Sequence, residues 1–391
     1  MHAPDHVVIG MTQIPGEVTM AFRKFAVILL AGCIPMTAVT TSSAQTPAAT
    51  AVASTPRSKT VEDLAAKLVD RFVDPETGLR YAAMLRANNA AGKYDAIASD
   101  EDFAKQVTAD LQAVAFDGHL KVFVQPKDQQ GGLPPGSAAA KSKTVEATAR
   151  LPIAIAYVRF GNFLGTDEGM AAVRKFIADN QDARTIIFDM RTHNGGGLDE
   201  MDVIFPYLFD KETALVDMDT RSAVERAGDF QLPPTPQLRK LASPDTVVRR
   251  EHFVTPLKSS PLSKAKVFVL TSGHTASAGE HFVLALRRTH RAIVIGETTY
   301  GAGNFGGNIP LEGNFSVFIP VGRTFDPDTG KGWDYVGVAP DVAVPQEQAL
   351  AEALLRSGLP KSEADKLAEQ YRPSAEAFTR KRKAPTSVAG I

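Results

Sequence analysis

Cysteine is almost absent from this chain of 391 residues, which carries a single one, Cys33. An intrachain disulfide and a zinc site built on cysteines are therefore excluded. The eight histidines include no H-E-x-x-H pair, so the sequence offers no histidine-based zinc site either. We expect neither a metal ion nor a cofactor.

Net charge is also nearly absent, since 43 Lys and Arg stand against 44 Asp and Glu, which gives −1. This balance argues against nucleic acid or an anionic membrane surface as a partner held by bulk charge. The chain has no G-x-G-x-x-G and no Walker A loop, which disfavours nucleotide binding. With 44% hydrophobic and 22% charged residues, the composition is that of an ordinary soluble protein.

No apolar run near the N-terminus is long enough to span a bilayer, which takes about 20 residues. Instead, the basic pair at 23–24 precedes a short apolar stretch at 25–32, and this pattern predicts a signal segment over residues 1–44. Two processing sites compete. L-A-G-C at 30–33 resembles a lipobox, a motif in which the cysteine, here Cys33, would be lipidated. S-S-A ending at residue 44 resembles an ordinary signal-peptidase cleavage site. Either one predicts export to the periplasm or outer envelope, and the first adds a lipid anchor.

The chain after the signal segment divides by composition into five parts. Residues 45–59 are rich in Ala, Thr and Pro and predict a disordered tether. Apolar residues at helical spacing predict a small helical domain over 60–118. Residues 119–150 predict a strand and a mobile loop. Residues 151–345 predict a core of alternating strands and helices. Within this core, we interpret residues 198–265 as a strand-poor insertion beside a cleft. Residues 346–391 predict two helices and a basic tail.

Two stretches of the core carry candidate chemistry. In residues 267–303, a short apolar strand leads through a turn rich in small residues into a helix, with Ser277 near the helix N-terminus. Free backbone N–H groups there stabilise a developing anion, although a serine at this place can also be a simple helix cap. The second stretch is a buried strand at 185–190 that runs into Gly195-Gly196-Gly197. Glycines let backbone N–H groups approach a ligand closely, or they form a tight turn.

Three segments together resemble a known family: TSGHTASAGEHF, RAIVIGETTYGAG and FSVFIPVGRTFDPDTGKGWDYVGVAPDVAV. They resemble the S41 tail-specific or C-terminal-processing serine peptidases, in the branch of the interphotoreceptor retinoid-binding protein repeats and the tricorn core. The resemblance covers roughly residues 60–345. It implies an α/β (α+β) fold, in which a small N-terminal helical domain precedes a crotonase-like ββα core. Residues 125–150 are too few for the PDZ domain that many members carry, so we expect none.

The resemblance implies a catalytic triad. Ser277, in the T-x-S-A-x-E element, takes the place of the nucleophile, and His119, in D-G-H-L-x-V, that of the general base. Asp334 stands where the family carries a glutamate that orients the base, with one carbon less of reach. The backbone N–H of Ala278, together with one from Gly195 or Gly196 in D-x-R-x-x-N-G-G-G, would form the oxyanion hole.

Two positions depart from the patterns of related branches. Gly118 occupies the position where tricorn-type relatives carry a second hydroxyl residue. Ala302 occupies the position of the lysine used by the PDZ-containing branch, so a Ser/Lys dyad is not expected. Other histidines near the motifs, His193, His274 and His281, could compete with His119 as the base.

The expected function is an exported serine endopeptidase that acts on polypeptides through an acyl-enzyme intermediate. The alternative is an inactive module of the retinoid-binding-protein type that binds hydrophobic ligands or peptides. The departures at Asp334 and Gly118 keep this alternative open, and the sequence leaves the oligomeric state undetermined.

Overall fold

The computed structural model describes residues 56–125 and 142–378. The predicted signal segment with Cys33, most of the expected tether, the middle of the expected loop and the basic tail lie outside the described residues. Within the part of the chain that is described, no helix is both long enough and apolar enough to cross a membrane.

Three helices open the described chain: α1 (Pro56–Arg71), α2 (Pro75–Ala90) and α3 (Asp100–Val114). Helix α1 begins inside the segment expected to be a tether, because proline is well suited to the first turn of a helix. Thr60 lies within α1, and its hydroxyl donates to the carbonyl of Pro56 at 3.2 Å. The caps of α2 and α3 are Asp74 and Ser99, whose side chains accept a backbone N–H in the first turn.

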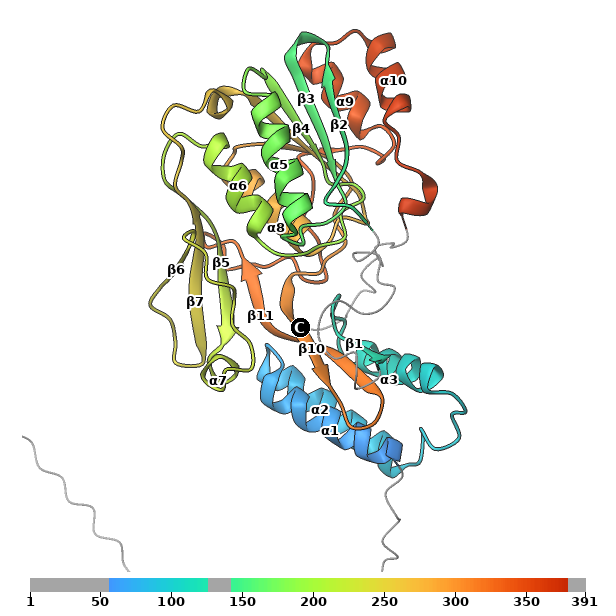
Figure 1. The fold of residues 1–391 in the computed structure, drawn as a ribbon. Helices are drawn as coiled ribbons and strands as arrows, with labels where there is room; N and C mark the ends of the chain where they lie inside the picture. Colours follow the sequence, from blue (N-terminus) through green and yellow to red (C-terminus); the bar gives the residue numbers. More distant parts are fainter. Residues whose placement is uncertain (1–55, 126–141, 379–391) are drawn as a thin grey trace, which may run out of the picture. The chain divides into compact units, whose positions relative to one another are not determined.

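The three helices pack their apolar faces against an antiparallel sheet (Figure 1). Its strand order is β1-β11-β5-β7-β6, and β10 pairs with β11 off this path. Leu64, Leu68, Phe103 and Leu111 from the helices share one buried cluster with Val317 of β11. The bounds are β1 (Lys121–Val124), β5 (Thr213–Arg221), β6 (Leu238–Lys240), β7 (Val247–Val254), β10 (Asn304–Pro310) and β11 (Phe315–Phe325).

Strands β5, β6 and β7 correct the expectation that residues 198–265 are poor in strands. The same region holds helix α6 (Asp199–Leu208) and the short helix α7 (Ser222–Arg226). Ion pairs conceal the strand pattern, because charged side chains of β5 and β7 lie opposite one another, as in Asp219 with Arg249 at 2.7 Å. Such pairs replace the alternation of apolar and polar residues by which a strand is recognised in a sequence.

The second sheet forms the core of the protein, with the strand order β12-β9-β8-β4-β3-β2. Its strands are parallel except β2, which pairs antiparallel with β3. Strand β2 lies at the end of the segment expected to be a loop, since its alanines and threonines gave only a weak apolar pattern. The bounds are β2 (Val145–Leu151), β3 (Ile155–Phe160), β4 (Thr185–Asp189), β8 (Lys266–Thr271), β9 (Ile293–Gly296) and β12 (Val342–Ala343).

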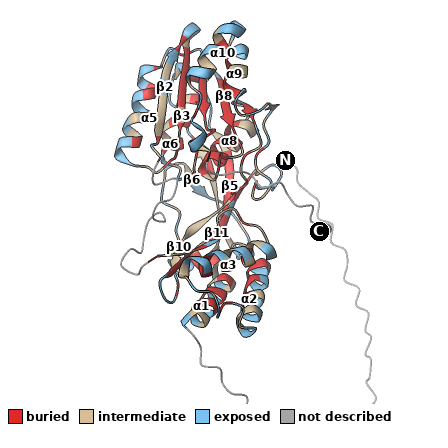
Figure 2. Cartoon of the chain, turned by 90° about the vertical axis from the view of Figure 1, so that its right-hand side faces the viewer, coloured by how far each residue is buried: buried red, intermediate tan, exposed pale blue. Residues whose placement is uncertain are grey.

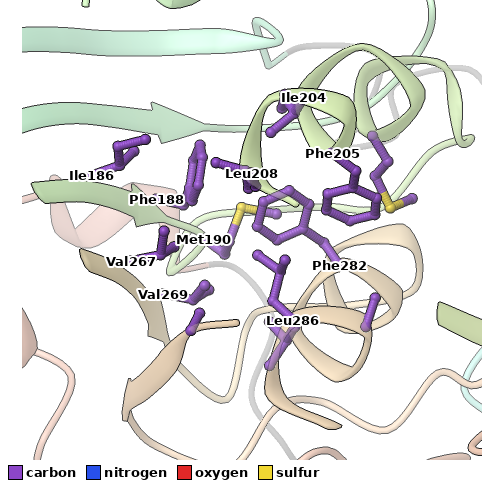
Figure 3. Close-up of a cluster of buried hydrophobic side chains, with 14 of the residues drawn as sticks. Ile186, Phe188, Met190, Ile204, Phe205, Leu208, Val267, Val269, Phe282 and Leu286 are labelled. Atoms are coloured by element: carbon purple, nitrogen blue, oxygen red, sulfur yellow. The ribbon is translucent and has the colours of Figure 1, made fainter. Parts of the chain in front are cut away.

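Helices cover both faces of this sheet. Successive side chains of each strand point to opposite faces and pack against the helices there. Val267 and Val269 of β8 join the cluster with α5 (Asp167–Asp179), α6 and α8 (Ala278–Arg288), part of which Figure 3 shows. Phe268 and Leu270 join the cluster on the other face with α9 (Ala349–Ser357), and α10 (Lys361–Gln370) packs on α9. Figure 2 shows that β3 and β8 of this sheet are largely buried. The fold class is confirmed: an N-terminal helical region precedes a mixed α/β core.

Candidate active site

Ser277 lies at the sharp turn between the end of β8 and the start of α8. Its backbone has φ 55° and ψ −119°, a left-handed conformation that costs a non-glycine residue about 1–3 kcal/mol. Strained turns of this kind, between a strand and a helix, expose a serine hydroxyl beside free N–H groups. The turn lies at the carboxyl end of a parallel strand, where open α/β sheets bind their ligands.

The loop after β4 holds this turn through hydroxyl groups. The Ser272 hydroxyl donates to the carbonyl of Arg191 at 2.6 Å, and the Thr275 hydroxyl donates to that of Met190 at 2.8 Å. The Ala276 N–H donates to the carbonyl of His193 at 3.2 Å. The small and hydroxyl residues before Ser277 therefore fix the turn against the neighbouring loop.

His119 reaches Ser277 from the segment between α3 and β1. Its Nε2 lies 3.1 Å from Ser277 Oγ, within hydrogen-bond reach. The imidazole stacks on Phe318 of β11, with ring centroids 5.2 Å apart. Two residues 158 positions apart in the chain are thus brought together as the sequence predicted.

The turn that carries His119 is held by Asp117. One oxygen of this buried carboxylate accepts the N–H groups of His119 at 2.8 Å and Leu120 at 2.9 Å. The other accepts the side-chain N–H of Asn304 at 2.9 Å. Sequence reasoning missed Asp117, although it belongs to the D-G-H element that singled out His119.

Asp334 lies close to this network. Its Oδ1 accepts the backbone N–H of Gly303 at 2.8 Å and that of Asn304 at 3.4 Å. Burial first, and then the charge of Asp117, raise the pKa of Asp334 well above the ordinary range, and the two N–H bonds only partly oppose this. Asn304 therefore bridges the candidate acid to the turn of the candidate base.

Glu280, three residues after Ser277, is fully buried and accepts four hydrogen bonds. The donors are the N–H of Ser277 at 2.9 Å, the hydroxyl of Thr299 at 2.5 Å, and the N–H groups of Gly301 at 2.7 Å and Ala302 at 2.8 Å. Burial raises the pKa of Glu280, and these bonds counteract it. The glutamate of the T-x-S-A-x-E element thus ties Ser277 to the loop at 299–302, a role that a capping-box pattern could have indicated.

Backbone N–H groups border the serine on two sides. No acceptor among the described residues takes the N–H of Ala278 or of Gly196. The Gly195 N–H donates to His193 Nδ1 at 3.1 Å. Gly195 must be a glycine, because its φ is 109° and a Cβ would lie 2.9 Å from Ser277 Cβ. Of the two glycines named from the sequence, Gly196 thus has the N–H that remains available.

Gly118 and Ala302 are neighbours. A Cβ on Gly118 would lie 3.0 Å from the Cβ of Ala302, closer than side chains ordinarily approach. A hydroxyl residue at 118 and a long side chain at 302 would therefore compete for one space. The two departures from the related branches have a common steric reason in this chain.

The other histidines near the motifs have different surroundings. His193 Nδ1 accepts the Gly195 N–H, and His274 Nε2 lies 3.1 Å from Asn194 Oδ1. His281 Nε2 lies 2.8 Å from His252 Nδ1, and His252 Nε2 lies 3.0 Å from Asp202 Oδ1. His119, by contrast, lies 3.1 Å from the Ser277 hydroxyl through its Nε2.

A cavity of about 210 Å³ opens beside Ser277. Its walls are mostly apolar, with Met218, Phe230, Leu232, Phe305 and Trp333 among them. The proline-rich segment around Pro233 lies along it, so the expectation that this segment flanks a cleft holds even though its neighbours are strands.

A serine hydroxyl at a strained strand-to-helix turn, within reach of an imidazole and beside free N–H groups, defines a hydrolase of the serine type. The family model of peptidase family S41 matches residues 154–344. A second model, the N-terminal domain of peptidase S41 in eukaryotic IRBP, matches residues 49–153. The chain belongs to peptidase family S41 and is a serine-type peptidase.

Solved structures are similar to this chain at low sequence identity. A putative peptidase from Parabacteroides merdae is 17% identical with a TM-score of 0.53, over 79% of this chain and 98% of that one. The photosystem II D1 C-terminal processing protease is 16% identical with a TM-score of 0.46, over 76% and 95%. The tricorn protease is 13% identical with a TM-score of 0.47, over 81% and 37%.

Proposed function

We propose that this chain is an exported serine endopeptidase that works through Ser277, His119 and Asp334. The contact of 3.1 Å between His119 Nε2 and Ser277 Oγ is the observation that carries the proposal. Export is supported by the signal pattern of residues 1–44, and the lipobox ending at Cys33 would add a lipid anchor.

In the proposed reaction, Ser277 Oγ attacks the carbonyl carbon of a peptide bond while His119 Nε2 takes the hydroxyl proton. The N–H groups of Ala278 and Gly196 stabilise the oxyanion. His119 returns the proton to the leaving amine, and an ester on Ser277 remains. Water, activated by His119, then hydrolyses this ester. Asp334 orients His119, and the apolar cavity takes a substrate side chain next to the bond that is cut.

Replacement of the nucleophile tests the proposal. Ser277→Ala should lose about a millionfold in kcat on a peptide library and should no longer react with a fluorophosphonate probe. Its free energy of unfolding should change by no more than about 1 kcal/mol, because alanine keeps the Cβ and only a capping hydroxyl is lost.

His119→Ala should match Ser277→Ala, since residues that act as one unit are not additive. Ser357→Ala is the matched control, because this hydroxyl donates to Ala353 in α9 and takes no part in the site. Wild-type turnover by Ser277→Ala would overturn the proposal. A wild type that neither cleaves peptides nor reacts with the probe, but binds apolar ligands, would indicate a carrier instead.

A further inference from the structure

The glycine loop (residues 194–197) is hydrogen-bonded to the segment that follows β3, residues 161–165. The Phe163 N–H donates to the carbonyl of Gly195 at 2.9 Å, and the Phe163 carbonyl accepts the N–H of Gly197 at 2.5 Å. These two bonds form a parallel bridge between the two stretches. The segment 161–165 therefore sets the path of the glycine loop.

The bond to Gly195 also fixes the direction of a candidate oxyanion donor. A peptide group is planar, and in the trans form its C=O and N–H point in opposite directions. The described residues contain no cis peptide bond. Because the Gly195 carbonyl points to Phe163, the Gly196 N–H of the same peptide group points away from it. Gly196 is exposed and lines the cavity beside Ser277, so whatever holds Phe163 in place also holds the direction of this N–H.

The side chain of Phe163 is fully buried and links the glycine loop to α8. Its ring centroid lies 4.4 Å from that of His193 and 5.9 Å from that of Phe282 in α8. Helix α8 begins at Ala278, whose N–H is the other candidate oxyanion donor. A Cβ on Gly196 would lie 1.8 Å from the Phe163 carbonyl oxygen, so this approach requires glycine. Phe163 thus contacts the elements that carry both donors.

The far end of the segment 161–165 is held by the side chain of Glu200, in α6. This side chain is fully buried, and its Oε1 accepts the Gly165 N–H at 2.9 Å. Burial raises the pKa of Glu200, and the Gly165 N–H opposes this shift. The bond does not depend on the outcome, because a carboxyl group accepts hydrogen bonds in both protonation states. Helix α6 follows the glycine loop in the chain, so Glu200 connects that loop to the segment that shapes it.

We propose that Glu200 is a positioning residue for the oxyanion donor: it fixes Gly165, and through the segment 161–165 it keeps the Gly196 N–H directed at the oxyanion. Its role in catalysis rests on the proposed peptidase function, whereas its hold on the glycine loop does not. A donor aimed at the oxyanion acts mainly in the transition state, so its displacement lowers kcat and leaves KM nearly unchanged. The competing role for Glu200 is a negative charge that stabilises the start of α6.

Three substitutions at Glu200 separate these two roles. Glu200→Gln keeps Oε1 and should retain nearly the wild-type kcat. Glu200→Asp keeps the acid at the start of α6 but is one carbon too short to reach Gly165, and Glu200→Met fills the space without an acceptor. For both of these we expect kcat in peptide hydrolysis to fall about 10- to 100-fold, with KM nearly unchanged. A Glu200→Asp protein as active as the wild type would refute the proposal.

Val173→Ala is the matched control for lost stability. Val173 is fully buried in α5 and belongs to the same core cluster as the apolar residues of α6. This variant should lower the Tm while kcat stays at the wild-type value. Equal losses of kcat in Val173→Ala and Glu200→Met would point to a general effect of stability and refute the positioning role.

Hydrogen exchange tests the hold on the glycine loop without peptide hydrolysis. In the full-length Ser277→Ala protein, NMR follows the amide exchange of Gly197, whose N–H is bonded to Phe163. Glu200→Met should speed this exchange at least about tenfold, whereas Glu200→Gln should not. An exchange rate unchanged in Glu200→Met would refute the proposal. Faster exchange in a protein whose Ser277 form cleaves no peptide would support the hold of Glu200 and refute the peptidase function instead.

Discussion

Asp117 connects the candidate base to the candidate acid through a set of directed hydrogen bonds. Its carboxylate accepts from the backbone of the His119 turn and from the side chain of Asn304, whose own N–H donates to Asp334. An acidic side chain suits this position because it accepts three hydrogen bonds, two from backbone N–H groups and one from the Asn304 side chain. The network can therefore be tested by exchanging the donor and the acceptor.

Asp117→Asn should lower kcat/KM by about 10- to 100-fold, because its amide would bring one donor against another and shift His119. Asn304→Asp alone should also lower it, since the new carboxylate would face Asp117. The double variant Asp117→Asn with Asn304→Asp reverses the direction of one hydrogen bond and keeps the total charge. We expect it to recover most of the activity in peptide hydrolysis. A double variant no more active than the worse single variant would contradict the network.

Asp334 should make the folded protein less stable as pH rises. Burial and the charge of Asp117 raise the pKa of Asp334 in the folded state, so the folded chain holds a proton that the unfolded chain releases near its ordinary pKa of about 3.9. Protonation therefore favours the folded state below that value, and this contribution falls as pH rises towards the raised pKa.

Asp334→Asn removes this titration and keeps an oxygen for the Gly303 N–H. Its Tm should exceed that of the wild type at pH 7.5, and the difference should shrink as the pH approaches 4, while peptide hydrolysis falls. Thermal melts of both proteins from pH 4 to 8 check this. A variant that melts below the wild type at pH 7.5 would show that the carboxylate stabilises the fold.

At the scale of elements, the end of β4 is fixed by a buried ion pair. Arg191 donates to both oxygens of Asp189, at 2.8 and 2.7 Å, and Tyr157 donates to the second oxygen at 2.7 Å. Burial opposes ionisation, yet Arg191 keeps the pKa of Asp189 below its ordinary value. The guanidinium also donates to the carbonyl of Gln346 at 2.9 Å, which ties the glycine loop to the segment before α9.

Arg191→Met should destabilise the protein by about 3–5 kcal/mol, because it leaves the buried carboxylate of Asp189 without its partner. Chemical denaturation measures the loss. Arg372→Met is the matched control: its ion pair with Glu369 is exposed, and such pairs contribute at most about 1 kcal/mol. Equal losses of unfolding free energy in the two variants would show that burial does not determine how much the Arg191–Asp189 pair stabilises the fold.

The sequence allowed the elements around Ser277 to be predicted because their apolar runs are short, buried and bounded by small residues. The same reasoning failed at β5 and β7, where Asp217, Asp219 and Arg249 form cross-strand ion pairs. The partners of these charges are distant in sequence, so no local pattern shows that they compensate one another. For the same reason, Asp202 and Trp333 could be assigned to one cavity only from the fold, and His252 is linked to them by its contact with Asp202 at 3.0 Å.

At the scale of the whole molecule, the candidate site draws on both sheets. Ser277 follows the core sheet, whereas His119 precedes β1 of the antiparallel sheet and stacks on β11. The resemblance to a family predicted that these two residues meet, and the hydrogen-bond geometry agrees. Periodicity alone could not have predicted it, because a distance across 158 residues depends on how the two layers pack.

This arrangement also acts as a safeguard. A newly made chain carries its candidate nucleophile, Ser277, and its candidate base, His119, in separate parts of the sequence, and on the proposed mechanism neither acts without the other. On the proposed mechanism, only the folded molecule brings the imidazole to the hydroxyl, so incomplete or misfolded copies should not cleave the proteins around them. On this proposal, folding itself completes the active site, whereas a zymogen becomes active only after a proteolytic cut.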